Sequence, residues 1–129
     1  MDTRLDLAIL KLERSNHWAA KLDMTESYQL GDDIIILGFP FGAKMADDVS
    51  QMSASFTRGY ISSIQKKDGL KRGLLDISAK AGNSGSPVVS VDSGNVIGIL
   101  SGSVLGGVNN REEVNYMIPV EYVLRLLSD

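Results

Sequence analysis

One short stretch of the chain combines a serine with glycines that would present it for chemistry. The segment Gly82-Asn83-Ser84-Gly85 is followed by Pro87 and an apolar run. Because glycine tolerates positive φ and close backbone approach, a serine on such a turn can face outward, with backbone N–H groups directed into the space before it. An acyl-transfer nucleophile with an oxyanion hole requires this arrangement. The same residues are also ordinary turn composition, and taken alone they favour a polar surface turn.

Few other side chains are suited to take part in such chemistry. His17 is the single histidine, which limits imidazole acid–base or metal chemistry to one position. Asp6 lies inside an apolar run, where it needs a partner if it is buried or else marks an exposed strand end. Lys80 is a conceivable base in a Ser–Lys pair, although a loop lysine that faces solvent is the simpler interpretation. The chain has no cysteine, which excludes disulfides and thiolate chemistry.

The bulk composition is that of one globular domain. The chain has 129 residues, of which 43% are hydrophobic and 22% are charged, with a formal net charge of −3. This balance gives no basic stripe, so nucleic acid is not an expected partner. No apolar run approaches the ~18 residues that span a membrane. No signal peptide is visible after Met1-Asp2, and the compartment is not indicated.

Short apolar runs separated by Gly, Asn and Asp turns predict about six strands from residue 31 onward. The close spacing of these runs, without a βαβ rhythm, predicts an all-β protein with an antiparallel barrel or sandwich. Residues 43–52 are expected to form a polar loop. The predicted strands are residues 34–38, 53–65, 72–79, 88–91, 96–100 and 113–118.

Several local features add detail to this layout. Residues 4–12 and 34–38 are apolar on both faces and predict strands covered on both sides, with helix as a competitor for 4–12. Gly59 inside a strand suggests a bulge or a bend, and residues 66–69 read as a hairpin turn. A terminal helix is predicted to open at Pro119. Its apolar stripe would consist of Val120, Val123, Leu124 and Leu127.

Five segments, in order, resemble the trypsin-like (chymotrypsin-fold) serine proteases, and most closely their HtrA/Deg branch. The resemblance covers nearly the whole chain and implies the second barrel of that fold, a six-stranded antiparallel Greek-key barrel with a C-terminal helix. The matching segments are Asp6-Leu7-Ala8-Ile9-Leu10-Lys11, Gly31-Asp32 through Gly42, Thr57-Arg58-Gly59-Tyr60-Ile61-Ser62, Asp76 through Val88, and Tyr116-Met117-Ile118-Pro119.

The resemblance implies roles for particular residues. Ser84 would be the nucleophile, with the backbone N–H groups of Gly82 and Ser84 as the oxyanion hole and Asp6 as the carboxylate that orients the base. Ser101 would lie beside that aspartate and along the substrate backbone. No strong charge occupies the expected pocket base, which favours a small or apolar side chain before the scissile bond. The pocket would be lined by Ser78, Gly102, Ser103 and Asn115. No cofactor or metal is implied.

The resemblance also implies that one member of the triad is missing. In this family the histidine precedes the aspartate in the chain, yet His17 follows Asp6 and is interpreted as a linker residue. We therefore expect residues 1–12 to be a remnant strand of the first barrel, 13–30 an inter-barrel linker, and 31–129 the second barrel. As a natural or engineered fragment the chain alone would hydrolyse peptides negligibly. The remnant would either fold back or cause self-association.

The expected partners follow from this interpretation. They are a peptide or unfolded-protein substrate, the missing N-terminal barrel, and a second copy of the chain in a homo-oligomer. One alternative is a non-catalytic peptide-binding or assembly module that pairs with a peptide along Ser101–Ser103. A further alternative is an unrelated all-β binding barrel in which the serine segment is only a turn.

Overall fold

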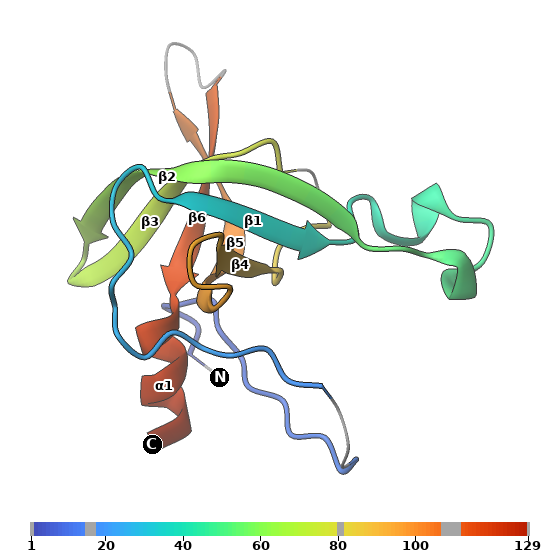
Figure 1. Cartoon of the computed structure of the whole chain (residues 1–129), viewed down its shortest axis with the longest axis horizontal. Coiled ribbons are helices and arrows are strands. Elements are labelled where there is room, and N and C mark those ends of the chain that lie inside the picture. The colour runs from blue at the N-terminus through green and yellow to red at the C-terminus, as the bar shows by residue number, and fades with distance from the viewer. Residues whose placement is uncertain (1, 15–17, 80–81, 107–111, 129) are drawn as a thin grey trace.

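The chain forms a closed, six-stranded antiparallel barrel followed by one helix (Figure 1). The computed structural model describes residues 2–14, 18–79, 82–106 and 112–128. The strand order around the barrel is β1-β2-β3-β6-β5-β4, which confirms the predicted fold class. The strands are β1 (Asp33–Gly38), β2 (Ser55–Lys67), β3 (Leu70–Asp76), β4 (Pro87–Ser90), β5 (Val96–Gly106) and β6 (Glu112–Pro119), and the helix is α1 (Val120–Ser128).

The barrel interior is filled by one face of each strand. In β1, Ile34 and Ile36 are fully buried, whereas Leu37 is exposed and Ile35 is half-buried. The prediction that this strand is covered on both faces was therefore wrong, because only the inside of the barrel is packed. The inner side chains form a single core of Tyr28, Ile34, Ile36, Ile61, Leu75, Ile77, Val88, Ile97, Leu100 and Met117.

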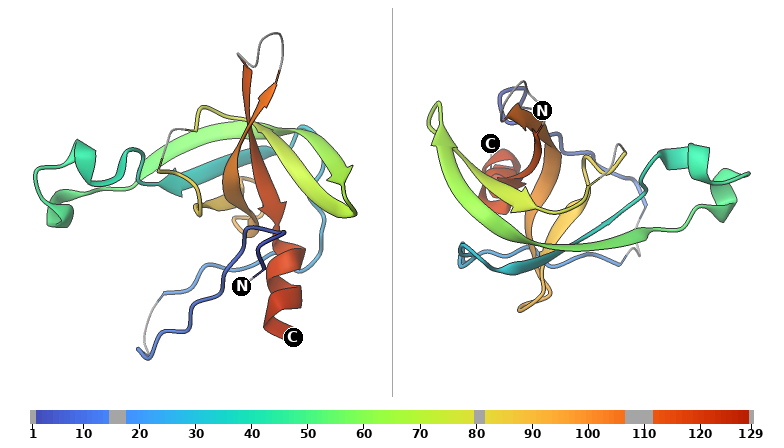
Figure 2. Two further views of the ribbon diagram at one scale, coloured as in Figure 1. Left: turned by 180° about the vertical axis from the view of Figure 1, so that it is seen from behind. Right: turned by 90° about the horizontal axis from the view of Figure 1, so that it is seen from above.

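The segment between β1 and β2 extends away from the barrel as an arm. It contains two short 3-10 helices, Gly42–Met45 and Val49–Gln51, where the sequence predicted a polar loop. The arm stands clear of the barrel in both views of Figure 2. Its base carries the exposed side chains of Phe39 and Phe41.

Of the two features predicted for β2, the hairpin turn at its end is confirmed and the position of the bulge is not. Asp68 and Gly69 both have positive φ, 53° and 77°, and close the β2–β3 hairpin as predicted. The irregularity in β2 lies between Ile61 and Ser63, so the bulge expected at Gly59 was misplaced. A Cβ at Gly59 would lie 2.2 Å from the backbone oxygen of Asp76. Glycine is required there by close backbone approach.

The N-terminal segment does not form the strand predicted over residues 4–12. Residues 2–7 make a tight turn in which Asp2 and Leu7 exchange backbone hydrogen bonds of 2.9 and 3.2 Å. Leu5 and Leu7 are buried against the end of the barrel, so this part folds back, whereas Leu10 and Leu12 remain exposed. A strand needs partners along its length, and the described residues provide none for 8–12. The expectation that the segment is covered on both sides was therefore wrong for residues 8–12, and only Leu5 and Leu7 are buried.

Helix α1 packs on the barrel through only part of the predicted stripe: Val120 is fully buried and Val123 packs against the apolar cluster. Tyr122 and Glu121 are buried, whereas Leu127 of the predicted stripe is 60% exposed. The Glu121 carboxylate accepts hydrogen bonds from the Tyr28 hydroxyl (3.1 Å) and from Lys71 Nζ (3.0 Å). The Lys71 ammonium also lies 4.8 Å from the centre of the Tyr28 ring. This three-residue polar cluster connects the helix, the start of β3 and the segment before β1.

The polar cluster predicts a loss of stability at alkaline pH. Burial raises the pKa of Tyr28 to about 12. Burial alone would lower the pKa of Lys71, but its contacts with Tyr28 and Glu121 outweigh burial and raise it. Both groups therefore hold their protons longer in the folded chain, so the free energy of unfolding should fall as pH rises from about 10 towards 12.

Urea unfolding at pH 9 and pH 11.5 measures this effect. We expect a decrease on the order of 1–2 kcal/mol, and a smaller decrease in Tyr28→Phe, which cannot ionise. Equal decreases in the parent chain and Tyr28→Phe would contradict the assignment to Tyr28.

Candidate active site

The loop before β4 presents Ser84 to solvent. Gly82 and Gly85 have φ values of +94° and +89°, a left-handed conformation that side-chain-bearing residues rarely adopt. The N–H of Gly85 donates to the Leu100 carbonyl at 2.6 Å, and the N–H of Ser86 donates to the Asn83 carbonyl at 3.0 Å. The first bond holds the loop on β5 and the second closes the loop on itself, while the Ser84 side chain stays exposed.

The same loop is fixed from below by the end of β1. Asn83 is only 3% exposed, and a Cβ on Gly38 would lie 2.6 Å from its Oδ1. A Cβ on Gly82 would lie 2.9 Å from the Phe39 carbonyl. Asn83 Oδ1 is buried without a hydrogen-bond partner among the described residues. Asn83 therefore packs against Gly38 and supports the loop that carries Ser84. Nothing local in the sequence indicated this contact.

Asp6 is remote from β5 in the sequence, but its side chain forms a hydrogen bond with a residue of that strand. Its carboxylate is exposed and accepts a hydrogen bond of 2.9 Å from the Ser101 hydroxyl. The Tyr116 hydroxyl lies 3.4 Å from the same Ser101 oxygen. A carboxylate only accepts, so the single Ser101 proton is directed to Asp6 and the Tyr116 hydroxyl is left to donate to Ser101. Of the two alternatives for Asp6, an exposed residue is therefore correct, but it has a partner.

Asp6 and the serine loop open onto one cavity. This cavity has a volume of about 260 Å³, and both Asp6 and Gly85 line it. The rest of its lining is apolar and comes from the N-terminal segment, β5 and α1. These residues are Leu7, Ala8, Ile9, Ile99, Val123 and Leu126. A group seated in the cavity would thus lie between a fixed carboxylate and the neighbour of Ser84.

The residues expected to line a specificity pocket are brought together in part. The Asn115 side-chain amide donates to the Ile77 carbonyl at 3.0 Å, next to the exposed Ser78. In the β5–β6 ladder, Ser103 is paired with Asn115, and Gly102 with Tyr116. The side chain of Ser103 lies outside the part of the chain that the structure describes. The segment that follows β3 and the strands β5 and β6 therefore meet at these residues.

The two residues weighed as a possible base on this chain are outside the described part of the structure. They are His17 and Lys80, so their predicted roles as linker residue and loop residue have no structural counterpart here. Within the described ranges, no side chain forms a hydrogen bond with Ser84, and no group of three acidic, His or Cys residues is placed to hold a metal ion.

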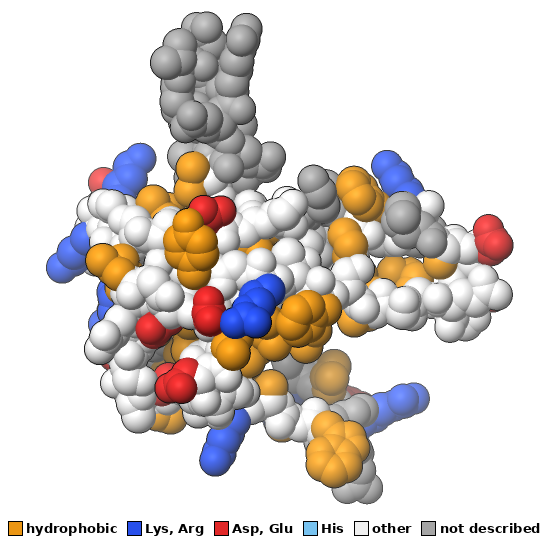
Figure 3. Space-filling view, turned by 45° about the horizontal axis from the view of Figure 1, so that its top comes forward, with side chains coloured by type: hydrophobic (Ala, Val, Ile, Leu, Met, Phe, Trp, Pro, Cys, Tyr) orange, Lys and Arg blue, Asp and Glu red, His pale blue; other side chains and the backbone are white. Residues whose placement is uncertain are grey.

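One face of the molecule carries charges of both signs. Acidic and basic side chains are interspersed with hydrophobic ones on the face shown in Figure 3. Exposed Arg58 and Asp33 pair at 2.8 Å on the outer face of β1 and β2. No described helix has the length and apolar character needed to cross a bilayer.

Comparison with known proteins bears on the family. Residues 1–99 match the model of the trypsin-like peptidase domain. The chain is 28% identical over 128 residues to a probable periplasmic serine endoprotease DegP-like of Chlamydia muridarum, covering 99% of this chain and 24% of that protein. It is 30% identical over 136 residues to the mitochondrial serine protease HTRA2 of Drosophila grimshawi, covering 99% and 28%.

The solved structures agree with the fold. The HtrA-type protease AlgWS227A with a decapeptide superimposes with a TM-score of 0.69 at 23% identity, covering 92% of this chain and 34% of that one. The inactive Ser343Ala form of Rv3671c from M. tuberculosis H37Rv has a TM-score of 0.63 at 18% identity, covering 84% and 51%. The chain thus spans about a quarter of the length of the two relatives above.

Proposed function

This chain belongs to the trypsin-like peptidase domain family, in its HtrA branch, and from that premise we propose that it carries the nucleophile of a serine endopeptidase. The observation that supports the proposal is the cavity shared by Asp6 and Gly85. Asp6, whose carboxylate accepts a hydrogen bond from Ser101, and Gly85, the neighbour of Ser84, line this cavity together. A base seated in it would lie between the carboxylate and the serine loop.

In the proposed reaction Ser84 Oγ attacks the scissile carbonyl carbon and loses its proton to a histidine. The N–H groups of Gly82 and Ser84 stabilise the oxyanion that forms. The histidine then returns the proton to the departing amine, the C–N bond breaks, and an acyl ester on Ser84 remains. Water hydrolyses that ester and regenerates the serine. Asp6 orients the histidine and stabilises its charged form.

We propose that the histidine belongs to an N-terminal barrel which docks over the cavity. Two features of the cavity suit the docking of such a barrel. The apolar lining of the cavity would accept an aliphatic side chain, and Asp6 is one of its lining residues. A serine at its free pKa is a weak nucleophile. The chain by itself would therefore hydrolyse peptides negligibly.

The proposed substrate is an extended peptide or unfolded protein. Among the described residues, β4 pairs with β5 only as far as Ile99, so the segment from Ser101 onward has one open edge. A peptide could pair there and place a small or apolar side chain against Ser78, Gly102, Ser103 and Asn115. The same open edge of β5 supports the second candidate function, a peptide-binding module without catalysis. A second copy of the chain could also pair along this edge.

A fluorophosphonate probe tests which residue reacts. We expect slow labelling of the chain alone, much faster labelling after addition of the histidine-bearing barrel of a relative, and mapping of the adduct to Ser84. Peptide binding without any labelling in the presence of that barrel would favour the non-catalytic module. Rapid labelling of the chain alone would show that the base is already present on it.

A further inference from the structure

We infer that Tyr122 of α1 is a positioning residue for Asp6, acting through the two leucines that flank it. Leu5 and Leu7 are 6% and 8% exposed and form one apolar cluster with Ile118 and Tyr122. Asp6 lies between the two leucines, so their anchorage determines where its carboxylate stands. The N-terminal turn lies beside α1 in Figures 1 and 2.

The turn that carries Asp6 needs such an anchor. Asp6 has a φ of 56°, a left-handed conformation that is uncommon for residues other than glycine. The backbone bonds between Asp2 and Leu7 close the turn, and the Asp2 carboxylate caps the N–H groups of Arg4 at 2.9 Å and Leu5 at 3.3 Å. All of these bonds are internal to the turn. They set its shape but do not attach it to the barrel.

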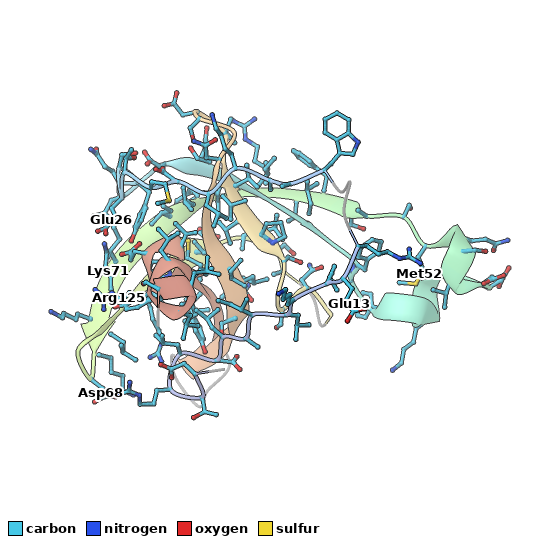
Figure 4. The ribbon with its side chains drawn as sticks, turned by 90° about the horizontal axis from the view of Figure 1, so that it is seen from below. Glu13, Glu26, Met52, Asp68, Lys71 and Arg125 are labelled. Carbon is cyan, nitrogen blue, oxygen red and sulfur yellow. The ribbon has the colours of Figure 1, made fainter. Side chains whose placement is uncertain are left out.

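Tyr122 is itself held in a fixed place. Its hydroxyl accepts a hydrogen bond of 2.7 Å from the backbone N–H of Lys71 at the start of β3. The guanidinium of Arg125, one turn further along α1, lies 5.0 Å from the centre of its ring. Figure 4 shows Lys71 near α1, the helix that carries Arg125. The ring is thus fixed to the barrel at one end and to its own helix on one face, and it offers a rigid surface to Leu5 and Leu7.

Two attachments therefore determine the position of Asp6. One is the direct hydrogen bond from Ser101, and the other is the apolar cluster in which Leu5 and Leu7 pack with Ile118 and Tyr122. Removing the Tyr122 ring from this cluster should leave the carboxylate free to move away from Ser101 even though no residue that bonds to it has changed. The importance of this for peptide hydrolysis rests on the proposed function, but the coupling between Tyr122 and Asp6 does not.

The test follows the Asp6 carboxyl carbon by NMR in the isolated chain. Ser101→Ala marks the chemical shift of a carboxylate that has lost its hydrogen bond. Tyr122→Ala should move the Asp6 resonance towards that value and accelerate amide exchange at Leu7 by about 10-fold. Tyr122→Phe keeps the ring and should rescue most of both effects. Val120→Ala is the matched control, because Val120 is fully buried in α1 but is not part of the apolar cluster.

The outcomes separate positioning from general loss of stability. A shift of the Asp6 resonance in Tyr122→Ala, absent in Val120→Ala and largely reversed in Tyr122→Phe, supports the inference. Equal effects of Tyr122→Ala and Val120→Ala, or an unmoved Asp6 resonance in a folded Tyr122→Ala, would overturn it. If Tyr122→Ala does not fold, Tyr122→Leu replaces it, because it removes the ring and keeps an apolar side chain. Failure of Ser84 to react with the probe would count against the proposed function alone.

Discussion

With the histidine-bearing barrel supplied, Ser84→Ala is expected to lower the turnover of peptide hydrolysis about 10⁶-fold. The whole covalent route depends on the Ser84 hydroxyl, and what remains is catalysis by binding and by the oxyanion donors. Asp6→Asn should cost about 10⁴-fold, because the base would be held in the wrong tautomer while the site keeps its shape. Turnover numbers for a short unstructured peptide, measured at saturating barrel concentration, give both values.

A matched serine separates this effect from general damage. Ser93 lies in the exposed turn between β4 and β5, so Ser93→Ala should keep full activity. The double variant Ser84→Ala/Asp6→Asn should be no slower than Ser84→Ala, since the two residues act as one unit. A double variant markedly slower than Ser84→Ala would indicate that Asp6 acts independently of the serine.

The barrel could be predicted because its signals are local. The hairpin Lys67–Leu70 depends on two adjacent residues that accept positive φ, and the strands depend on short apolar runs between turns. The faces of β1 could not be assigned in this way. Ile34, Ile35, Ile36 and Leu37 are all apolar, so only the closed barrel decides which of them point inward.

The candidate site could be predicted only through the resemblance, because its contacts are remote in sequence. Asp6 and Ser101 are 95 residues apart and 2.9 Å apart in space. No periodicity connects them. The contact between Asn83 and Gly38 could not be predicted for the same reason. The turn around Asp6 was predicted as a strand because its leucines alternate as strand residues do. An apolar pattern shows which side chains could be buried, but residues remote in sequence decide which of them are covered.

Lys71→Met is expected to destabilise the fold by roughly 2–3 kcal/mol. The substitution keeps an unbranched side chain over the Tyr28 ring but removes the cation that faces Glu121. The Glu121 side chain is only 10% exposed, so its carboxylate would keep one hydrogen bond, from Tyr28, and lose its counter-charge. The cost should be lower than for a fully buried pair, because the Lys71 side chain remains 31% exposed. Urea unfolding at pH 7 measures the change.

A double-mutant cycle determines whether the charge or the packing is responsible. Glu121→Leu removes the carboxylate and should relieve the unpaired charge that Lys71→Met leaves, so the double variant is expected to be more stable than Lys71→Met alone. Lys66→Met is the control, since Lys66 is exposed on β2 and should tolerate the change within about 0.5 kcal/mol. Additive losses in the cycle would mean that Lys71 and Glu121 contribute separately. A positive coupling would establish that Lys71 of β3 and Glu121 of α1 stabilise the fold as an ion pair.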